Sequence, residues 1–350
     1  MKHFVDAGAL EVIAPNFKRR LSGVTSTIVQ LIPLQRKLGL NIAALGPGLP
    51  DSVAAVRKRD IWKLWSKPKN GKFRVWHARR NVEMIGGLFL ARILRMPLKL
   101  VFTSAAQRDH KPFTKWLINR MDRVIATSAR SGAFLAVPHQ VIMHGIDTEA
   151  FHPAANDDDR FEATDLPGKY AIGCSGRVRH QKGTDLFVEA MIALLPAHPD
   201  WTAIIVGRTT AEHAAFEAEL RRKVAHAGLG ERIRFLGEVN DIKLWYRRFS
   251  LFVAPSRNEG FGLTPLEAMA SGCAVVTSDA GAYAEMAAGG AGIVVPAGDL
   301  AALKVAIGKF ISDPVELAAS GGKARDHVVK HFRLENEAEA LNAVYNALLK

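Results

Sequence analysis

Short apolar runs rich in valine, isoleucine and alanine alternate along the whole chain with amphipathic stretches of roughly ten to eighteen residues. Such alternation is typical of βαβ units, in which crossover helices join parallel strands. The pattern recurs in both halves of the chain. It therefore predicts an α/β protein with two doubly wound, parallel sheets.

The predicted elements fall at regular places. In the first half we expect strands near residues 10–15, 40–45, 73–77, 98–103, 123–127 and 140–143, and helices near 24–38, 81–95, 111–121 and 128–136. In the second half we expect strands near 169–175, 201–206, 232–235, 250–254, 273–277 and 291–295, and helices near 182–196, 210–228, 240–248, 263–271 and 299–312. Two further helices, near 314–330 and 335–349, follow the last strand, and the final one can pack on either lobe.

A chain of 350 residues is too long for one ordinary core. The polar segment Asn156-Asp157-Asp158-Asp159-Arg160, followed by Pro167-Gly168, indicates an interdomain linker. Its aspartates are interpreted as solvated, because metal sites need ligands held by fixed elements. We expect an N-terminal Rossmann-like domain over 1–155, a linker over 156–168, a C-terminal Rossmann-like domain over 169–330, and a helix over 331–350 that can pack back on the first domain.

The net charge of +13 is unevenly distributed, because residues 1–153 hold 25 Lys/Arg against 9 Asp/Glu, whereas residues 154–350 hold 22 against 25. A one-sided basic field favours a polyanion, whether nucleic acid, an anionic bilayer or a phosphorylated acceptor. Two basic stretches, 57–69 and 111–123, also contain tryptophan. They either lie on an anionic membrane or bury their tryptophans beneath a solvated basic face.

The sequence also indicates a compartment. Its two cysteines, Cys174 and Cys273, lie in apolar runs, which favours core positions in a reducing environment over a disulfide framework. Residues 1–14 lack the features of a signal peptide, and charges interrupt the apolar stretch 85–102. We expect a cytoplasmic protein without a transmembrane helix, able to bind peripherally to the inner face of the cytoplasmic membrane.

A basic, glycine-containing loop follows the strand predicted at 169–175. Its sequence is Gly176-Arg177-Val178-Arg179-His180-Gln181-Lys182-Gly183. Gly176 permits close backbone approach, while Arg177 and Lys182 place two cations near a helix N-terminus, where a diphosphate is stabilised. A solvated basic turn is the alternative.

Two carboxylates flank a glycine-rich loop after the strand near 250–254, in the run Glu259-Gly260-Phe261-Gly262-Leu263-Thr264-Pro265-Leu266-Glu267. The glycines expose backbone N–H groups to an anion, Glu259 can face a sugar, and Glu267 can accept hydrogen bonds from ribose hydroxyls. Alternatively, Glu259 stabilises the helix N-terminus through the dipole and Glu267 is solvated.

With both motifs in place, the second half resembles the GT-B retaining glycosyltransferases of family 4, which carry a Gly-Arg…Lys-Gly loop and a Glu-x7-Glu motif. The resemblance implies two Rossmann-like domains that face a central cleft. The N-terminal domain over 1–155 would bind the acceptor, and the C-terminal domain over 169–330 would bind a nucleotide-sugar donor. The resemblance further implies that Arg177 and Lys182 bind the donor diphosphate, that Glu259 contacts the transferred sugar, and that Glu267 holds the ribose. The backbone positions implied to complete the donor site are Gly260, Phe261, Gly262 and Leu263.

The resemblance also bears on mechanism. Retaining transfer on one face through an oxocarbenium-like state is implied, with the two cations stabilising the leaving diphosphate. No metal or other cofactor is then required.

The first half matches the family less closely. Gly23, in Ser22-Gly23-Val24, stands where the family usually has two glycines, and we keep it as a donor-binding candidate. The strand near 98–103 ends without the family's histidine, which leaves His77 and His110 as acceptor-side candidates. A lone histidine at a strand end is often structural.

Residues 76–81 and 103–108 look similar to lipopolysaccharide-core mannosyltransferases, which implies GDP-mannose as donor and a lipid-linked saccharide as acceptor. A UDP-sugar donor is the alternative, because loops that vary on one fold select the donor. A basic nucleic-acid-binding protein is a rival, but no such motif is present and we expect no nucleic-acid partner. A sugar-nucleotide epimerase or a phosphorylase on the same fold is the other rival.

Overall fold

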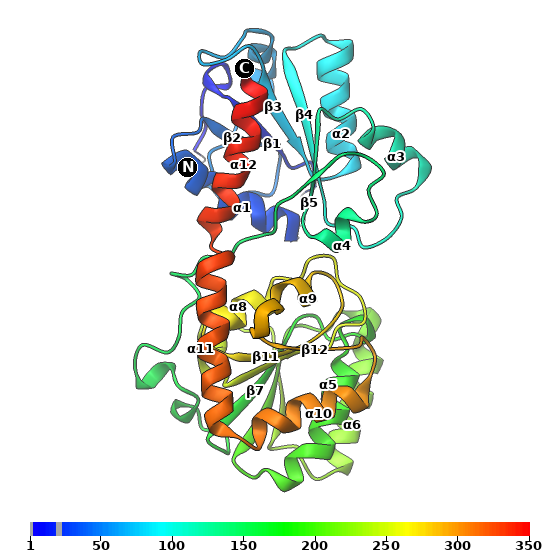
Figure 1. Ribbon diagram of the computed structural model, residues 1–350, viewed down its shortest axis with the longest axis vertical. Helices are drawn as coiled ribbons and strands as arrows, with labels where there is room; N and C mark the ends of the chain where they lie inside the picture. Colours follow the sequence, from blue (N-terminus) through cyan, green and yellow to red (C-terminus); the bar gives the residue numbers. More distant parts are fainter. Residues whose placement is uncertain (1–2, 19–22) are drawn as a thin grey trace. The chain divides into compact units, whose positions relative to one another are not determined.

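The computed structural model describes residues 3–18 and 23–350. The chain divides into two compact units (Figure 1). Unit 1 comprises Met1–Gly145 and Leu334–Lys350, and unit 2 comprises Ile146–Arg333. Each unit is built on its own six-stranded sheet. The cleft predicted between the two domains stays a prediction.

Unit 1 contains a parallel sheet of strand order β2-β1-β3-β4-β5-β6. Its strands are β1 (Val12–Pro15), β2 (Ile42–Leu45), β3 (Arg74–Ala78), β4 (Leu98–Ser104), β5 (Arg123–Ala126) and β6 (Gln140–Val141). Its helices are η1 (Ala7–Ala9), α1 (Gly23–Lys37), η2 (Lys58–Trp65), α2 (Asn81–Leu88), the π-helix η3 (Phe89–Ile93), α3 (Pro112–Ile118), α4 (Ala129–Gly132) and α12 (Leu334–Leu349).

Unit 2 contains a second parallel sheet, of order β12-β11-β10-β7-β8-β9. Its strands are β7 (Tyr170–Ser175), β8 (Trp201–Val206), β9 (Ile233–Gly237), β10 (Leu251–Ala254), β11 (Ala274–Ser278) and β12 (Ile293–Val295). Its longer helices are α5 (Thr184–Leu194), α6 (Ala214–His226), α7 (Ile242–Arg248), α8 (Thr264–Ala270), α9 (Tyr283–Met286), α10 (Leu300–Ile311) and α11 (Pro314–His331). Its 3₁₀ turns are η4 (Asp157–Asp159), η5 (Phe161–Ala163), η6 (His180–Lys182), η7 (Leu195–Ala197), η8 (Ala211–His213) and η9 (Ala288–Gly290).

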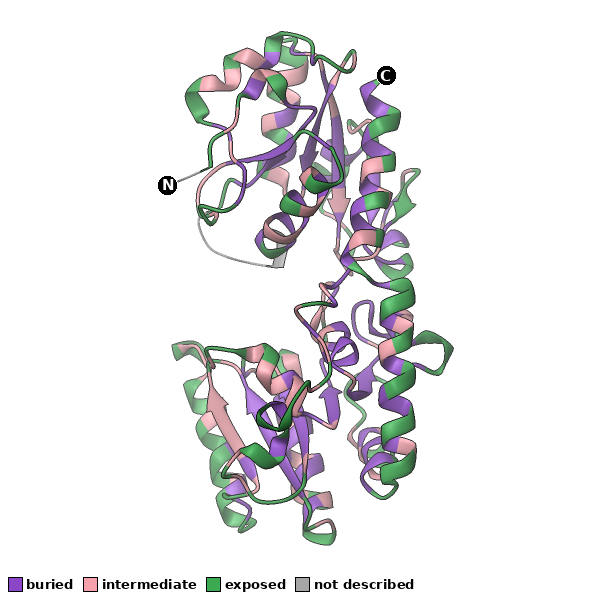
Figure 2. Cartoon of the chain, turned by 90° about the vertical axis from the view of Figure 1, so that its left-hand side faces the viewer, coloured by how far each residue is buried: buried purple, intermediate pink, exposed green. Residues whose placement is uncertain are grey.

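The central strands lie in the cores of their units, whereas both residues of the edge strand β6 are exposed and β9 is largely half-buried (Figure 2). In β10 and β11, for example, every residue is buried. Strands of a parallel sheet covered on both faces read as continuous apolar runs, which explains why the sequence predicted them well. Each predicted strand is present within two residues of its expected ends, and the doubly wound α/β class is confirmed.

The final helix, α12, belongs to unit 1 although it follows unit 2 along the chain. It packs beside α1 and against β3. Gln35 donates a hydrogen bond to Asn342 over 2.8 Å, and the Tyr345 hydroxyl lies 2.6 Å from His77 Nδ1. Apolar residues of α12 therefore complete the core of unit 1.

The predicted linker over 156–168 is wrong as a boundary, because these residues lie inside unit 2 and the division falls at residues 145 and 146. Asp159 is buried and accepts a hydrogen bond from Arg247 Nε over 2.9 Å, and Phe161 is also buried. The prediction that all three aspartates are solvated is therefore wrong for Asp159. A backbone hydrogen bond from Ala155 and the nearby Arg247 lower the pKa of its carboxyl.

Strand order determines where each sheet can bind a ligand. In unit 2 the order reverses between β7 and its neighbour β10, and in unit 1 it reverses between β1 and β3. Ligands of open parallel sheets bind beyond the carboxyl ends of the strands at such a reversal. In unit 2 this point is occupied by the loops that follow β7 and β10.

Candidate functional site

The loops after β7 and β10 meet beyond the ends of their strands. Arg257 N donates a hydrogen bond to Gln181 O over 2.9 Å, and Gln181 Nε2 donates to Asn258 O over 3.3 Å. Gly183 has a φ of 70°, and a Cβ there would lie 1.9 Å from Pro255 O. Only glycine fits this contact, so the conformation of one loop depends on the position of the other.

An ion pair between Lys182 and Glu259 joins the two predicted motifs across this junction. Lys182 ends the 3₁₀ turn η6, and Glu259 lies between β10 and α8. Their side chains are only 17% and 18% exposed, so solvent screens the pair weakly. Glu259 also accepts a hydrogen bond from Gly260 N over 3.2 Å, and Tyr283 OH lies 3.5 Å from its second oxygen.

The second predicted carboxylate, Glu267, lies in the first turn of α8. Tyr246, a fully buried residue of α7, donates its hydroxyl to Glu267 Oε2 over 2.7 Å. Burial raises the pKa of Glu267, while Tyr246 and Lys182 partly oppose that shift. The pKa of Tyr246 is raised well above its ordinary value by burial and by the Glu267 charge. Tyr246 thus holds one carboxylate oxygen, and a carboxylate can accept further hydrogen bonds through its other oxygen.

The two predicted cations differ in environment. Lys182 is half-buried and bound to Glu259, whereas Arg177 is exposed. Arg179 lies close to Arg177, and its Nε is buried without a hydrogen-bond partner among the described residues. Burial and the Arg177 charge lower the pKa of Arg179. The loop therefore concentrates positive charge at the switch point, as an anionic ligand requires.

The remaining predicted donor positions lie around the same junction. Gly176 adopts a φ of 138°, with Lys182 Cε 3.5 Å from where a Cβ would stand. Gly260, Phe261, Gly262 and Leu263 form the loop between β10 and α8. A Cβ on Gly262 would lie 2.4 Å from the Tyr283 ring, so a side chain there would clash. In unit 1, Gly23 is the first residue of α1, and residues 19–22 before it lie outside the described residues.

The two acceptor-side candidates have different environments. His77 is 1% exposed in β3, and its ring nitrogens lie 2.6 Å from Tyr345 OH and 2.7 Å from Thr103 Oγ1. Burial, with the Arg79 charge, holds its pKa well below the ordinary value. Both ring nitrogens are engaged within unit 1, which favours His110 over His77 as the acceptor-side candidate, and the role of either histidine stays a prediction.

His110 lines a pocket of about 440 Å³ beyond the carboxyl end of β4, and its Nε2 lies 3.2 Å from Ser104 Oγ. Arg79, Arg108 and Lys111 line the same pocket, against the single carboxylate of Asp109. Burial lowers the pKa of His110, as do the Lys115 and Arg108 charges. This pocket combines a neutral imidazole with three cations and suits a polar, anionic ligand.

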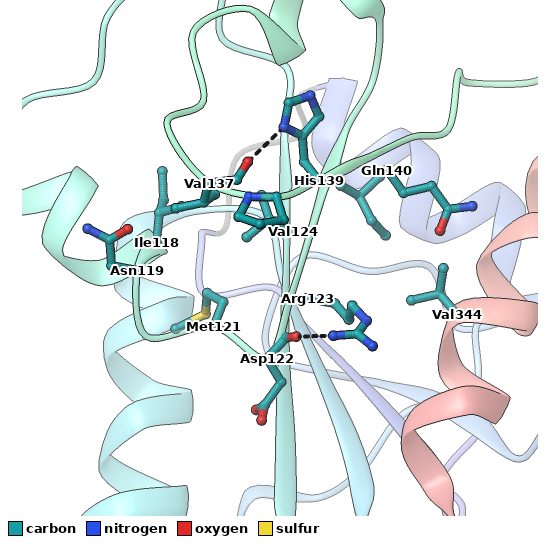
Figure 3. Close-up of a pocket in the computed structure, with 12 residues that line it drawn as sticks. Ile118, Asn119, Met121, Asp122, Arg123, Val124, Val137, His139, Gln140 and Val344 are labelled. Atoms are coloured by element: carbon teal, nitrogen blue, oxygen red, sulfur yellow. Dashed lines mark hydrogen bonds between the residues drawn. The ribbon is translucent and has the colours of Figure 1, made fainter.

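A second pocket of unit 1 lies near the amino ends of β5 and β6 (Figure 3). His139 Nδ1 lies 2.9 Å from Val137 O, and Arg123 donates to Asp122 O over 3.0 Å. These polar groups are satisfied locally, and the pocket is at the end of the sheet away from the strand carboxyl ends. It has no part in the predicted site.

The sequence analysis missed Tyr246 and Tyr283, which contact the two predicted carboxylates. Burial raises the pKa of both hydroxyls, so both remain protonated donors near neutral pH. The chain has only four tyrosines, and two of them serve this site. The small number of tyrosines was the one feature of the sequence that pointed to these two residues. It could not show which carboxylate each tyrosine contacts.

Comparison with known proteins identifies the family. Residues 169–313, the region of both motifs, match the model of the glycosyl transferases group 1 family. The chain is 61% identical over 345 residues to the lipopolysaccharide core biosynthesis mannosyltransferase LpcC of Rhizobium leguminosarum bv. viciae, covering 98% of each chain. The chain belongs to the group 1 glycosyltransferases. It is therefore an enzyme, which favours a glycosyltransferase over the alternative of a nucleic-acid-binding protein.

Other similar proteins support the same family and fold. The chain is 55% identical over 350 residues to the lipopolysaccharide core biosynthesis mannosyltransferase LpsB of Rhizobium meliloti (strain 1021), covering 99% of this chain and 100% of that one. The structure of Anabaena HepE in complex with UDP matches with a TM-score of 0.81 at 19% identity, over 97% of this chain and 100% of that one. The GT-B fold implied by the resemblance is thereby confirmed.

Two further predictions concern metals and membranes. Within residues 3–18 and 23–350, no group of three or more His, Cys, Asp or Glu side chains is placed to hold a metal ion. The metal-free mechanism stays a prediction.

None of the helices in that part of the chain has the length and apolar character needed to cross a bilayer.

Proposed function

We propose that this glycosyltransferase is a retaining enzyme of family 4 that transfers mannose from GDP-mannose to a lipid-linked saccharide of the lipopolysaccharide core. The observation that carries the proposal is the junction of the two motifs, where Lys182 contacts Glu259 at the switch point between β7 and β10. The names of LpcC and LpsB supply the sugar and the class of acceptor.

The donor diphosphate is proposed to bind the cations of the β7 loop. Phosphate oxygens accept charge-assisted hydrogen bonds from ammonium and guanidinium groups, so a diphosphate competes with Glu259 for the Lys182 ammonium. Arg177 is exposed and available to the same anion. As Lys182 turns to the diphosphate, the Glu259 carboxylate becomes available to a sugar hydroxyl, which couples donor binding to sugar positioning.

The transfer step follows from this placement. The bond between the anomeric carbon and the diphosphate oxygen breaks, and its electron pair stays on the diphosphate, where Arg177 and Lys182 stabilise the charge. The acceptor hydroxyl oxygen bonds to the same face of the carbon, and its proton passes to the departing phosphate oxygen. Glu259 lies beside the positive charge that develops on the sugar. Glu267 binds the ribose and so fixes the position of the donor.

The acceptor is proposed to bind the pocket of unit 1 that contains His110. Its cations Arg79, Arg108 and Lys111 favour a saccharide that carries a carboxylate or a phosphate. The neutral His110 ring can exchange a hydrogen bond with an acceptor hydroxyl. A lipid-linked acceptor also places the enzyme at the inner face of the cytoplasmic membrane.

The choice of donor is tested by calorimetry on the purified protein. GDP-mannose is expected to bind more tightly than UDP-glucose or UDP-N-acetylglucosamine, and GDP more tightly than UDP. A preference for a UDP-sugar would retain the family and the site but replace the donor. If no sugar nucleotide binds, the proposed donor site itself is wrong.

A chelator tests the metal-free mechanism. Because Lys182 and Arg177 supply the positive charge at the diphosphate, we expect EDTA to leave the rate of mannosyl transfer unchanged. The rate is measured on protein dialysed against EDTA, with and without added Mg²⁺ or Mn²⁺. Loss of activity that either ion restores would show that a metal stabilises the leaving group.

A further inference from the structure

An apolar stripe runs along the exposed side of α2 and η3 in unit 1. Val82, Ile85, Phe89 and Ile93 are 46%, 43%, 51% and 68% exposed. They follow one another at intervals of three or four residues, which places them on one helical face. The opposite side is already buried in the core through residues such as Met84. The side chains of this stripe are therefore not part of the core of unit 1.

The neighbouring elements extend this apolar surface. In η2, Trp62 and Trp65 are 62% and 50% exposed. Trp65 Nε1 donates a hydrogen bond to Leu94 O over 2.7 Å, which fixes η2 beside the end of η3. An open pocket of about 450 Å³ is lined by residues of η2, α2 and η3, among them Lys58, Ile61 and Phe89.

The helix α3 continues the surface on the other side of α2. Asn81 at the start of α2 donates a hydrogen bond to Thr114 of α3 over 2.8 Å. Phe113 and Trp116 are 56% and 47% exposed, and their rings stack with centroids 5.9 Å apart. We call the exposed apolar residues of these elements the aromatic face: Trp62, Trp65, Val82, Ile85, Phe89, Ile93, Phe113 and Trp116.

Unit 2 shows that such exposure is not general in this chain. Among its described residues, the large apolar side chains that are exposed are all valines, at 294, 305, 315 and 329. They lie on β12, α10 and α11, the two on α11 being 14 residues apart, and single exposed apolar residues of this kind are normal on a protein surface. A contiguous group that contains aromatic rings instead indicates an interaction site.

Charge indicates which partner this site accepts. Lys58, Arg59, Lys67, Arg92 and Arg95 are exposed within or beside η2 and η3. The one acidic residue of α2, Glu83, is buried and bound to Arg80. Basic residues around apolar and tryptophan side chains match an anionic bilayer, where the rings enter the interface and the cations contact the head groups.

We propose that the aromatic face docks unit 1 on a lipid bilayer that carries anionic head groups. The proposal rests on the proposed function, because a lipid-linked acceptor is reached at a bilayer surface. The pocket between η2 and η3 then opens beside the lipid, with Lys58 in reach of a phosphate.

The test is co-sedimentation of the full-length protein with vesicles of phosphatidylcholine alone and of equal parts phosphatidylcholine and phosphatidylglycerol. We expect binding to the anionic vesicles only, weakened by salt because exposed charges are screened. The variant Trp62→Ser/Phe89→Ser/Ile93→Ser should lower the partition coefficient by about tenfold. Val305→Ser/Val315→Ser, which removes exposed apolar side chains of unit 2, is the matched control and should bind as the wild type does.

A second pair of variants tests the charge. Lys58→Glu/Lys67→Glu/Arg92→Glu should weaken vesicle binding by roughly fivefold or more for each cation. Lys243→Glu/Lys309→Glu/Lys323→Glu makes the same change on exposed lysines of unit 2 and should have a smaller effect.

Three outcomes would overturn the proposal: no vesicle binding, equal binding to both kinds of vesicle, or equal loss in test and control variants. If the wild type dimerises and the serine variant does not, a second copy covers the face instead. All measurements omit the sugar nucleotide, and GDP-mannose calorimetry on each variant reports separately on the proposed function.

Discussion

Replacing Lys182 with alanine is expected to lower kcat/KM for mannosyl transfer by about a thousandfold, the cost of losing a preorganised group that stabilises a developing charge. Lys182 is only 17% exposed and lies at the switch point of unit 2, where its ammonium faces Glu259. In the proposed mechanism its removal takes a cation away from the leaving diphosphate, and it also leaves the Glu259 carboxylate without its ion-pair partner.

The measurement is the steady-state rate with GDP-mannose and a lipopolysaccharide core acceptor, after circular dichroism has shown that the variant is folded. Lys223→Ala is the matched control, because Lys223 forms a 2.8 Å ion pair with Glu189 in the same unit but is 40% exposed and distant from the switch-point loops in the sequence. Its kcat/KM should remain close to that of the wild type. A Lys182→Ala variant with unchanged kcat/KM would remove Lys182 from the mechanism.

A double variant separates the two effects of the lysine. Lys182→Ala/Glu259→Gln removes both charges of the pair, so it should regain thermal stability that Lys182→Ala loses by leaving a carboxylate unpaired. It should not regain activity, because neither the diphosphate nor the sugar recovers its partner. Recovery of activity in the double variant would mean that the pair serves stability alone.

The sequence predicted the elements of this fold well where a local pattern determines them. The strand β10 is a continuous apolar run because both faces of its sheet are covered, and the Glu259 loop follows directly from it. The glycine at 183 was noted as part of a motif. The sequence alone could not show that this glycine allows the β7 loop to approach Pro255, because the two residues are far apart along the chain.

Contacts between distant residues account for the errors. Asp159 was interpreted as solvated because its partner, Arg247, is 88 residues away in the sequence. For the acceptor-side candidate His77, the contact with Tyr345 could not be predicted, because Tyr345 is 268 residues away, on a helix that returns to unit 1. The apolar stripe of α2 and η3 was predicted only as part of a helix near 81–95, since apolar residues that repeat at helical intervals are the usual sign of a buried face.

The second large effect is expected at Glu267. Glu267→Ala should weaken GDP-mannose binding by about a hundredfold and Glu267→Gln by about tenfold, in line with the loss of hydrogen bonds to a charged acceptor. The glutamine keeps one acceptor oxygen, either for the ribose hydroxyls or for Tyr246, whose hydroxyl lies 2.7 Å from the carboxylate, but it lacks the charge and the second oxygen. Both values are measured by calorimetry, with the exposed Glu162→Gln as a control.

The same carboxylate should reduce the stability of the fold at neutral pH. Burial raises the pKa of Glu267 above its ordinary 4.5, so the folded chain binds this proton more tightly than the unfolded chain does. The stability that this provides is present below pH 4.5 and is lost as the pH rises through the raised pKa. Glu267→Gln, which cannot ionise, should therefore have a higher Tm than the wild type at neutral pH.

This difference in Tm should narrow as the pH falls towards 4.5, whereas Glu162→Gln should show no such trend. Weaker donor binding together with a higher Tm identifies a group kept for its ligand in spite of its effect on folding. A lower Tm at neutral pH with unchanged donor binding would instead make Glu267 a structural partner of Tyr246. In that case the ribose must be held by another group in the loops that follow β7 and β10.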